Sequence, residues 1–193
     1  WSSDVCSSDL VLHFRAEVYI QGAIDNLLKN ARPLPDVYYI ADDFCSSDGP
    51  LFSPIVWREW VKPYLTRIGE KIHAKGVKFM IHVCGSVRPY IPDLIEAGVD
   101  ILEPVQTSAV GMSLEGLKKD FGKDITFYGS IDTHHILPKG TTQDVSDAVK
   151  YTIDVMAPGG GFILGPAHTY IQPDTPIENI ITMYRVAAEY GKY

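Results

Sequence analysis

The sequence alternates short β-rich runs with amphipathic stretches of helical length, and this alternation constrains the fold more than any other feature. Five runs are rich in β-branched or aromatic residues and end near Gly, Pro or Asp, which is typical of strands; they cover residues 37–42, 77–83, 99–103, 125–130 and 161–165. The stretches with helical spacing cover residues 17–31, 54–74, 87–97, 113–121, 142–156 and 176–190. Strands and helices that alternate in this way form an α/β fold with a parallel sheet and right-handed crossovers.

Several helix boundaries are marked by residues that prefer those positions. Ser53 and Thr175 each precede a proline, which is the order of an N-cap hydroxyl followed by proline in the first helical turn. Gly76 and Gly98 follow helical stretches, where glycine commonly forms the C-terminal cap.

Two α/β architectures fit this pattern, a doubly wound open sheet and a (β/α)8 TIM barrel. A doubly wound sheet would place a glycine-rich phosphate turn after an early strand, whereas the glycine cluster at residues 159–161 precedes the last strand. The barrel is therefore preferred. Because a complete barrel has eight units in about 250 residues, we expect residues 11–193 to form one domain that holds roughly the last five β/α units.

The first ten residues differ in character from the rest of the chain. The string WSSDVCSSDL contains SSD twice, and it has neither the positive start nor the apolar centre of a signal peptide. It resembles translated read-through of a sequencing adaptor, so residues 1–10 are predicted to be a non-native tail. The chain is accordingly expected to be an N-terminally truncated fragment.

Charge, hydropathy and cysteine content exclude several classes of protein. The 17 basic and 24 acidic residues give a formal charge of -7, the wrong sign for a nucleic-acid partner. The apolar runs have the length of strands, far below the roughly 20 residues that cross a bilayer. The 3 cysteines form no closely spaced pair, which fits a protein of the reducing cytoplasm.

Polar residues suited to catalysis gather where the predicted strands end. In a TIM barrel, the strand ends and the loops that follow them form the active site. One such His or Asp is often an ordinary loop residue, but the coincidence over five strands predicts a single catalytic mouth. Its candidate residues are Asp42, Asp43, His82, Cys84, Glu103, Asp132, His134, His135 and His168.

The most specific of these signals is His82-Val83-Cys84-Gly85. Residues two apart on a strand face the same side, so the imidazole and the thiol can converge on one cation. Nitrogen and sulfur ligands suit Zn²⁺, and a catalytic zinc site has three protein ligands and one open position. His168 is the candidate third ligand, because the last strand lies beside the first once a barrel closes. By itself the pair is a weak signal, since a buried cysteine is often only a small apolar residue.

Longer segments of the chain resemble the uroporphyrinogen decarboxylase (URO-D) superfamily. Asp42-Asp43, Ser53-Pro54 with Trp57 and Pro63, and the closing GPAH and PDTP are part of the match. The segments that carry most of the resemblance are FMIHVCGSV at 79–87, IPDLIEAGVDILEPVQ at 91–106 and YGSID at 128–132. Together they span nearly all of residues 11–193.

This resemblance implies one of two activities. The decarboxylases of porphyrin biosynthesis use no cofactor and resemble this chain at Gly129-x-x-Asp132 and at a histidine that matches His168. The corrinoid-linked methyltransferases bind zinc through a His-x-Cys pair and a further cysteine near the last strand. This chain has the pair at His82 and Cys84 but carries His168 in place of the final cysteine. The pair favours the methyltransferase branch.

In that branch, the resemblance implies that zinc holds a thiol as a thiolate, which takes a methyl group from a methylcorrinoid supplied by a partner protein. The other partner would be a small-molecule methyl acceptor. Asp42 or Glu103 would orient His82 through its second ring nitrogen. The candidate catalytic residues are Asp42, Asp43, Glu103 and Asp132, and the candidate metal ligands are His82, Cys84 and His168.

Two alternatives remain open from the sequence. A uroporphyrinogen decarboxylase would need cationic groups for the acetate arms of its substrate, and Arg88 is the main candidate near the predicted mouth. An inactive barrel fragment is the other alternative, because five units leave two open sheet edges, which promote aggregation.

Overall fold

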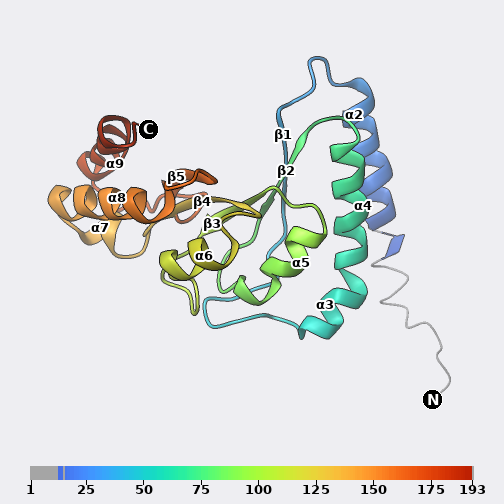
Figure 1. Cartoon of the computed structure of the whole chain (residues 1–193), viewed down its shortest axis with the longest axis horizontal. Helices are drawn as coiled ribbons and strands as arrows, with labels where there is room; N and C mark the ends of the chain where they lie inside the picture. The colour runs from blue at the N-terminus through green and yellow to red at the C-terminus, as the bar shows by residue number, and fades with distance from the viewer. Residues whose placement is uncertain (1–12, 15, 193) are drawn as a thin grey trace.

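The structure is a computed structural model that describes residues 13, 14 and 16–192. The predicted non-native tail at residues 1–10 lies outside the described residues. Where the sequence predicts a helix over 17–31, the chain forms a π-helical segment, η1 (Tyr19–Asp25), which continues as α2 (Asn26–Asn30). These segments lie beside α4 (Lys62–His73) at one edge of the molecule (Figure 1).

Five parallel strands form one sheet in the order β1-β2-β3-β4-β5. All five predicted strands are confirmed, with boundaries that move by at most two residues. The strands are β1 (Val37–Ala41), β2 (Lys78–His82), β3 (Ile101–Val105), β4 (Thr126–Ile131) and β5 (Phe162–Pro166).

The helices that follow the strands form an arc around the sheet, from α4 near β1 and β2 to α8 (Thr142–Met156) near β4 and β5 (Figure 1). This arrangement is that of five consecutive units of a (β/α)8 barrel, as the alternation predicts. In the described part of the chain, no helix has the length and apolar character that a membrane crossing requires. Besides α4, the helices are α3 (Pro54–Trp60), η2 (Arg88–Tyr90), α5 (Ile91–Glu96), α6 (Leu114–Phe121), α7 (Ile136–Lys139), α8 (Thr142–Met156) and α9 (Ile177–Tyr190).

The helix predicted over 54–74 is divided at Val61 into α3 and α4. Proline has no backbone N–H, so it disrupts a helix when more than one helical turn precedes it. Pro63 lies in the first turn of α4, where that missing donor is tolerated. The division therefore follows from Pro63, which is a boundary signal within the predicted helix.

The predicted helix caps are confirmed at three of the four positions. The hydroxyl of Ser53 accepts a hydrogen bond from the amide of Val56, and Gly76 and Gly98 have positive φ angles of 72° and 87°. The prediction for Thr175 is wrong. Pro176 is the N-cap of α9, and the buried hydroxyl of Thr175 has no hydrogen-bond partner among the described residues.

A buried aromatic cluster of Phe44, Trp57 and Tyr90 anchors the loop that follows β1. Its ring centroids lie 4.9 to 5.3 Å apart in tilted and edge-on arrangements, and all three side chains are at most 1% exposed. Such pairs contribute about 0.5–1.5 kcal/mol beyond the burial of their surface. The hydroxyl of Tyr90 also donates to the carbonyl of Phe52 at 2.6 Å. The cluster thereby fixes the backbone beside Asp43.

Candidate metal centre

The parallel register of the sheet brings the predicted site residues to one edge. β1 pairs Ala41 with His82, and β2 pairs His82 with Glu103, so these three residues form a row across the strands. Asp43 follows β1 by two residues, and Cys84 follows β2 by two residues. The carboxyl ends of neighbouring parallel strands meet, which is where barrel enzymes carry their active sites.

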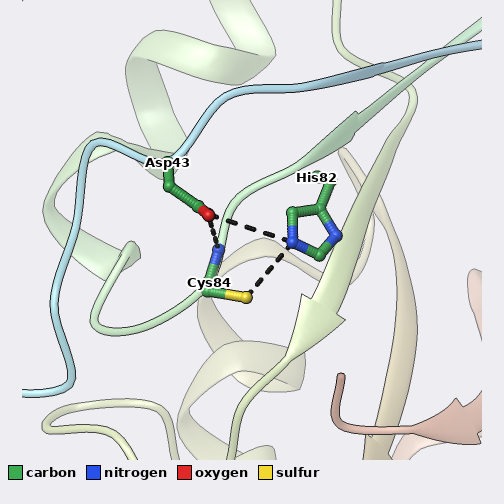
Figure 2. A group of neighbouring side chains, drawn as sticks. All are labelled: Asp43, His82 and Cys84. Carbon is green, nitrogen blue, oxygen red and sulfur yellow. Dashed lines mark hydrogen bonds and ion pairs between the residues drawn. The ribbon is translucent and has the colours of Figure 1, made fainter. Parts of the chain in front are cut away.

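Asp43, His82 and Cys84 form a compact cluster of metal-ligating side chains (Figure 2). Their candidate ligand atoms all lie within 4.8 Å of one another. Cys84 Sγ is 3.2 Å from His82 Nε2, and Asp43 Oδ1 is 3.9 Å from the same nitrogen. The loop after β1 contributes the carboxylate, the end of β2 contributes the imidazole, and the turn after β2 contributes the thiol.

The second nitrogen of the His82 ring faces the carboxylate of Glu103. Nδ1 lies 2.5 Å from Glu103 Oε2, and both residues are more than 90% buried. The hydroxyl of Tyr39 donates to the same carboxylate at 3.3 Å, and that of Thr169 lies 3.2 Å from His82 Nδ1. The predicted contact between Glu103 and His82 is therefore present. It fixes the ring so that Nε2 faces Cys84 and Asp43.

The pKa of His82 is raised to about 10. Its hydrogen bond with Cys84 is the largest cause and the bond with Glu103 the second, and both outweigh burial, which lowers the value. Without a metal ion, both ring nitrogens would carry protons at neutral pH. A metal ion that binds Nε2 must therefore displace a proton.

The turn after β2 is held against the loop after β1. Asp43 Oδ1 accepts a hydrogen bond from the amide of Cys84 at 2.9 Å, and the carbonyl of Ser46 accepts one from the amide of Ser86 at 2.8 Å. Gly85 adopts a φ of +89°, and a Cβ atom there would lie 2.4 Å from the oxygen of Ser46. Only glycine permits this close approach of the two loops.

His168 lies near the cluster, but it is not one of the three grouped residues. Its ring centroid is 6.1 Å from that of His82, although β5 is at the opposite edge of the described sheet from β1. The amide of Tyr170 donates to His168 Nδ1 at 3.0 Å, so in the neutral ring Nε2 carries the hydrogen and acts as a donor in this arrangement. The role of His168 as a metal ligand stays a prediction.

Asp132 has a local structural use at the end of β4. Its Oδ1 accepts hydrogen bonds from the amides of His134 and His135, both at 2.6 Å, in the turn before α7. These bonds lower the pKa of Asp132, although burial, the largest single influence, raises it. The structure does not group Asp132 with His82 and Cys84, so its catalytic role stays a prediction.

Neither Asp42 nor Arg88 is one of the three grouped residues, although the amide of Asp42 donates to the carbonyl of His82 at 3.0 Å. Asp42 lines a cavity between β1 and α4 together with Trp60 and Tyr64. Arg88 forms an ion pair with Asp120, and its guanidinium lies 5.5 Å above the ring of Phe121. Arg88 was the candidate for the acetate arms in the decarboxylase alternative, and that role stays a prediction, with the charge of Arg88 paired with Asp120 on α6.

Three residues that contact the site were not recognised from the sequence: Tyr39, Gln106 and Thr169. Tyr39 could have been found, because it precedes Ala41 by two residues and so shares its face of β1. Gln106 and Thr169 lie in loops, where no periodicity indicates the direction of a side chain. The one indication that Thr169 contacts the site was its position next to His168 in the sequence.

Comparisons with known proteins agree with this fold. The sequence matches uroporphyrinogen decarboxylase (URO-D) over residues 19–190. A methylated-thiol–coenzyme M methyltransferase from Methanosarcina mazei is 24% identical over 157 residues, which cover 79% of this chain and 38% of that protein. A solved methyltransferase structure from Methanosarcina mazei has a TM-score of 0.70 at 23% identity, covering 92% of this chain and 48% of its own.

The chain thus spans less than half the length of these two relatives. The likeness to the solved structure shows a shared fold, and the family match extends from η1 to the end of α9. On that match, the chain belongs to the uroporphyrinogen decarboxylase family.

Proposed function

We propose that this chain is the zinc-binding part of a methyltransferase that moves a methyl group from a methylated corrinoid protein to a small-molecule thiol. The observation that carries the proposal is the cluster of Asp43, His82 and Cys84, in which imidazole and thiol face each other at 3.2 Å. The relative from Methanosarcina mazei supports methyl transfer at thiol sulfur, because its name specifies a methylated thiol as the methyl donor and coenzyme M, a thiol, as the acceptor.

The donor atoms and their spacing fit a zinc ion. Tetrahedral zinc with nitrogen at about 2.0 Å and sulfur at about 2.3 Å holds its ligand atoms roughly 3.3–3.6 Å apart. The separations of 3.2 Å from His82 Nε2 to Cys84 Sγ and 3.9 Å from Nε2 to Asp43 Oδ1 lie close to this range. His82, Cys84 and Asp43 would hold the ion, with His168 as the alternative third ligand. Three protein ligands leave one position open for substrate.

Zinc bound there would lower the pKa of a substrate thiol and keep it in the thiolate form that attacks a methyl group. The chain's own contribution is orientation. Glu103 holds the Nδ1 side of His82, so that Nε2 stays directed at the cluster. Tyr39 and Thr169 donate hydroxyl hydrogens to Glu103 and thereby hold its carboxylate in place.

The test of this proposal is the metal content of the purified protein, measured by elemental analysis, together with thiol methylation in the complete protein that carries this sequence. Methylcobalamin serves as a free stand-in for the corrinoid protein. We expect one zinc ion per chain and methylation that a chelator abolishes. A metal-free protein that decarboxylates uroporphyrinogen would overturn the proposal in favour of the decarboxylase alternative.

His168→Ala distinguishes the two candidates for the third ligand. Because Asp43, and not His168, lies within 4.8 Å of the other donor atoms, we expect the alanine variant to keep its zinc. Asp43→Ala should weaken zinc binding by at least about tenfold, since partners beyond the ligands alone change affinity 10–100-fold. Competition titration with a zinc chelator measures both variants. The opposite order of affinities would assign the third position to His168.

A further inference from the structure

Gln106 is a buried side chain that joins three loops around Cys84. It directly follows β3 and is 7% exposed. Its Oε1 accepts a hydrogen bond from the amide of Gly85 at 2.9 Å. Its Nε2 donates to the hydroxyls of Ser47 and Ser108, at 3.2 and 3.4 Å. The loops that follow β1, β2 and β3 therefore meet at one amide group.

The orientation of this amide follows from its partners. A backbone N–H can only donate, so the oxygen of Gln106 must face Gly85. The serine hydroxyls can accept as well as donate, and they receive the two hydrogens of the NH₂ group. All the polar atoms of the side chain are thus satisfied at a buried position, where an unpaired group would be costly.

The bond to Gly85 bears directly on the direction of the Cys84 thiol. The peptide plane before Cys84 is held by Asp43, which accepts from the Cys84 amide at 2.9 Å. The peptide plane after Cys84 is held by Gln106 through the Gly85 amide. Since planar peptides leave only φ and ψ to rotate, fixing both flanking planes fixes both angles at Cys84. The direction of its Cβ is then determined, and only the χ1 rotamer remains to place Sγ beside His82 Nε2.

We infer that Gln106 is a positioning residue for the Cys84 thiolate, acting from β3 on a turn that belongs to β2. This inference rests on the proposed zinc site and extends it to a residue that touches neither metal nor substrate. The inference gives the two residues different roles. Asp43 is both a metal ligand and the acceptor for the Cys84 amide, whereas Gln106 supports the turn without binding the metal.

The test uses Gln106→Met, which keeps the length and apolar volume of the side chain but removes the acceptor. Cobalt(II) is the probe, because its thiolate charge-transfer absorption reports the bond to Cys84. We expect cobalt affinity to fall about 10–100-fold, the range for residues that support metal ligands, and the charge-transfer band to shift or weaken. Gln106→Glu keeps an acceptor for Gly85, while Ser47 and Ser108 can donate to its carboxylate, so it should restore the band.

Asn179→Leu is the matched control. Asn179 is 2% exposed, and its Nδ2 donates to the carbonyls of Leu137 and Gly140 at 2.9 and 2.8 Å, so it is also a buried amide that joins two segments. It lies on α9, away from the metal cluster. Its loss should lower the melting temperature and leave cobalt affinity and the band unchanged.

The outcomes separate this inference from the proposed function. If the wild-type protein binds no cobalt or zinc, the metal site and the positioning role both fall. If the wild-type protein binds cobalt and Gln106→Met lowers only the melting temperature, as Asn179→Leu does, the positioning role is overturned and the metal site stands. Should Gln106→Met fail to fold, a Gln106→Glu variant with wild-type affinity and band supports the role, and one with lost affinity contradicts it.

Discussion

In the proposed zinc-dependent methyltransferase, replacing Cys84 by serine is expected to remove the zinc and to abolish methyl transfer. A serine hydroxyl stays protonated at neutral pH, so the site would lose its anionic sulfur ligand. Loss of a residue that only supports a ligand lowers metal affinity 10–100-fold, so loss of the ligand itself should lower the affinity by more than about 100-fold. Elemental analysis after dialysis, followed by competition titration, measures the effect.

Cys45→Ser is the control for this experiment. Cys45 is 7% exposed, and burial raises the pKa of its thiol to about 12, so it remains a neutral core residue. Its replacement should lower stability and leave zinc content intact. His82→Ala should instead match Cys84→Ser. A Cys84→Ser protein that retains one zinc ion per chain would contradict the assignment of the ligands.

Replacing Gly85 by alanine is expected to damage both the stability and the metal site. The new Cβ would lie 2.4 Å from the oxygen of Ser46, and the backbone would have to keep a φ of +89°. The left-handed conformation costs about 1–2 kcal/mol and the overpacking about 1–3 kcal/mol more. The two loops must then separate, which moves Cys84 away from Asp43. Urea denaturation and zinc titration measure the two effects.

Gly76→Ala separates the conformational cost from the steric one. Gly76 has a φ of +72°, but no atom lies within 4 Å of the position its Cβ would take. Only the conformational cost of about 1–2 kcal/mol should appear there, with unchanged zinc affinity. Equal losses of stability in the two variants, with zinc binding intact in both, would show that the contact between the loops is not needed.

The strands could be predicted from the sequence because each is a short run rich in β-branched or aromatic residues that ends near Gly, Pro or Asp. The row from Ala41 to Glu103 follows from those strands alone, since neighbouring parallel strands end at the same edge. The pairing of Glu103 with His82 could be predicted from the sequence for the same reason. The helix caps at Ser53, Gly76 and Gly98 were also predictable, because local sequence patterns determine them.

The remaining features depend on contacts between loops that are distant in the sequence. Asp43 was expected at the mouth, but its place beside His82 and Cys84 depends on how the loop after β1 folds over the loop after β2. Gln106 stands 21 residues from Gly85 in the chain, and no spacing rule relates them. The contacts of Arg88 could not be predicted either, because its ion pair with Asp120 joins η2 to α6, a contact that periodicity does not indicate.

The pairing of His82 with Glu103 in the sheet also bears on protein design. Two residues in register on adjacent parallel strands have a separation set by the strand spacing of about 4.8 Å, and their side chains emerge on the same face. The contact between a histidine and its orienting carboxylate can therefore be designed into such a strand pair by choosing two positions, whereas the hydroxyls that hold the carboxylate, those of Tyr39 and Thr169, come from other segments. The cysteine is not portable in this way, because its direction is set by loops, and a designer would have to carry those loops with it.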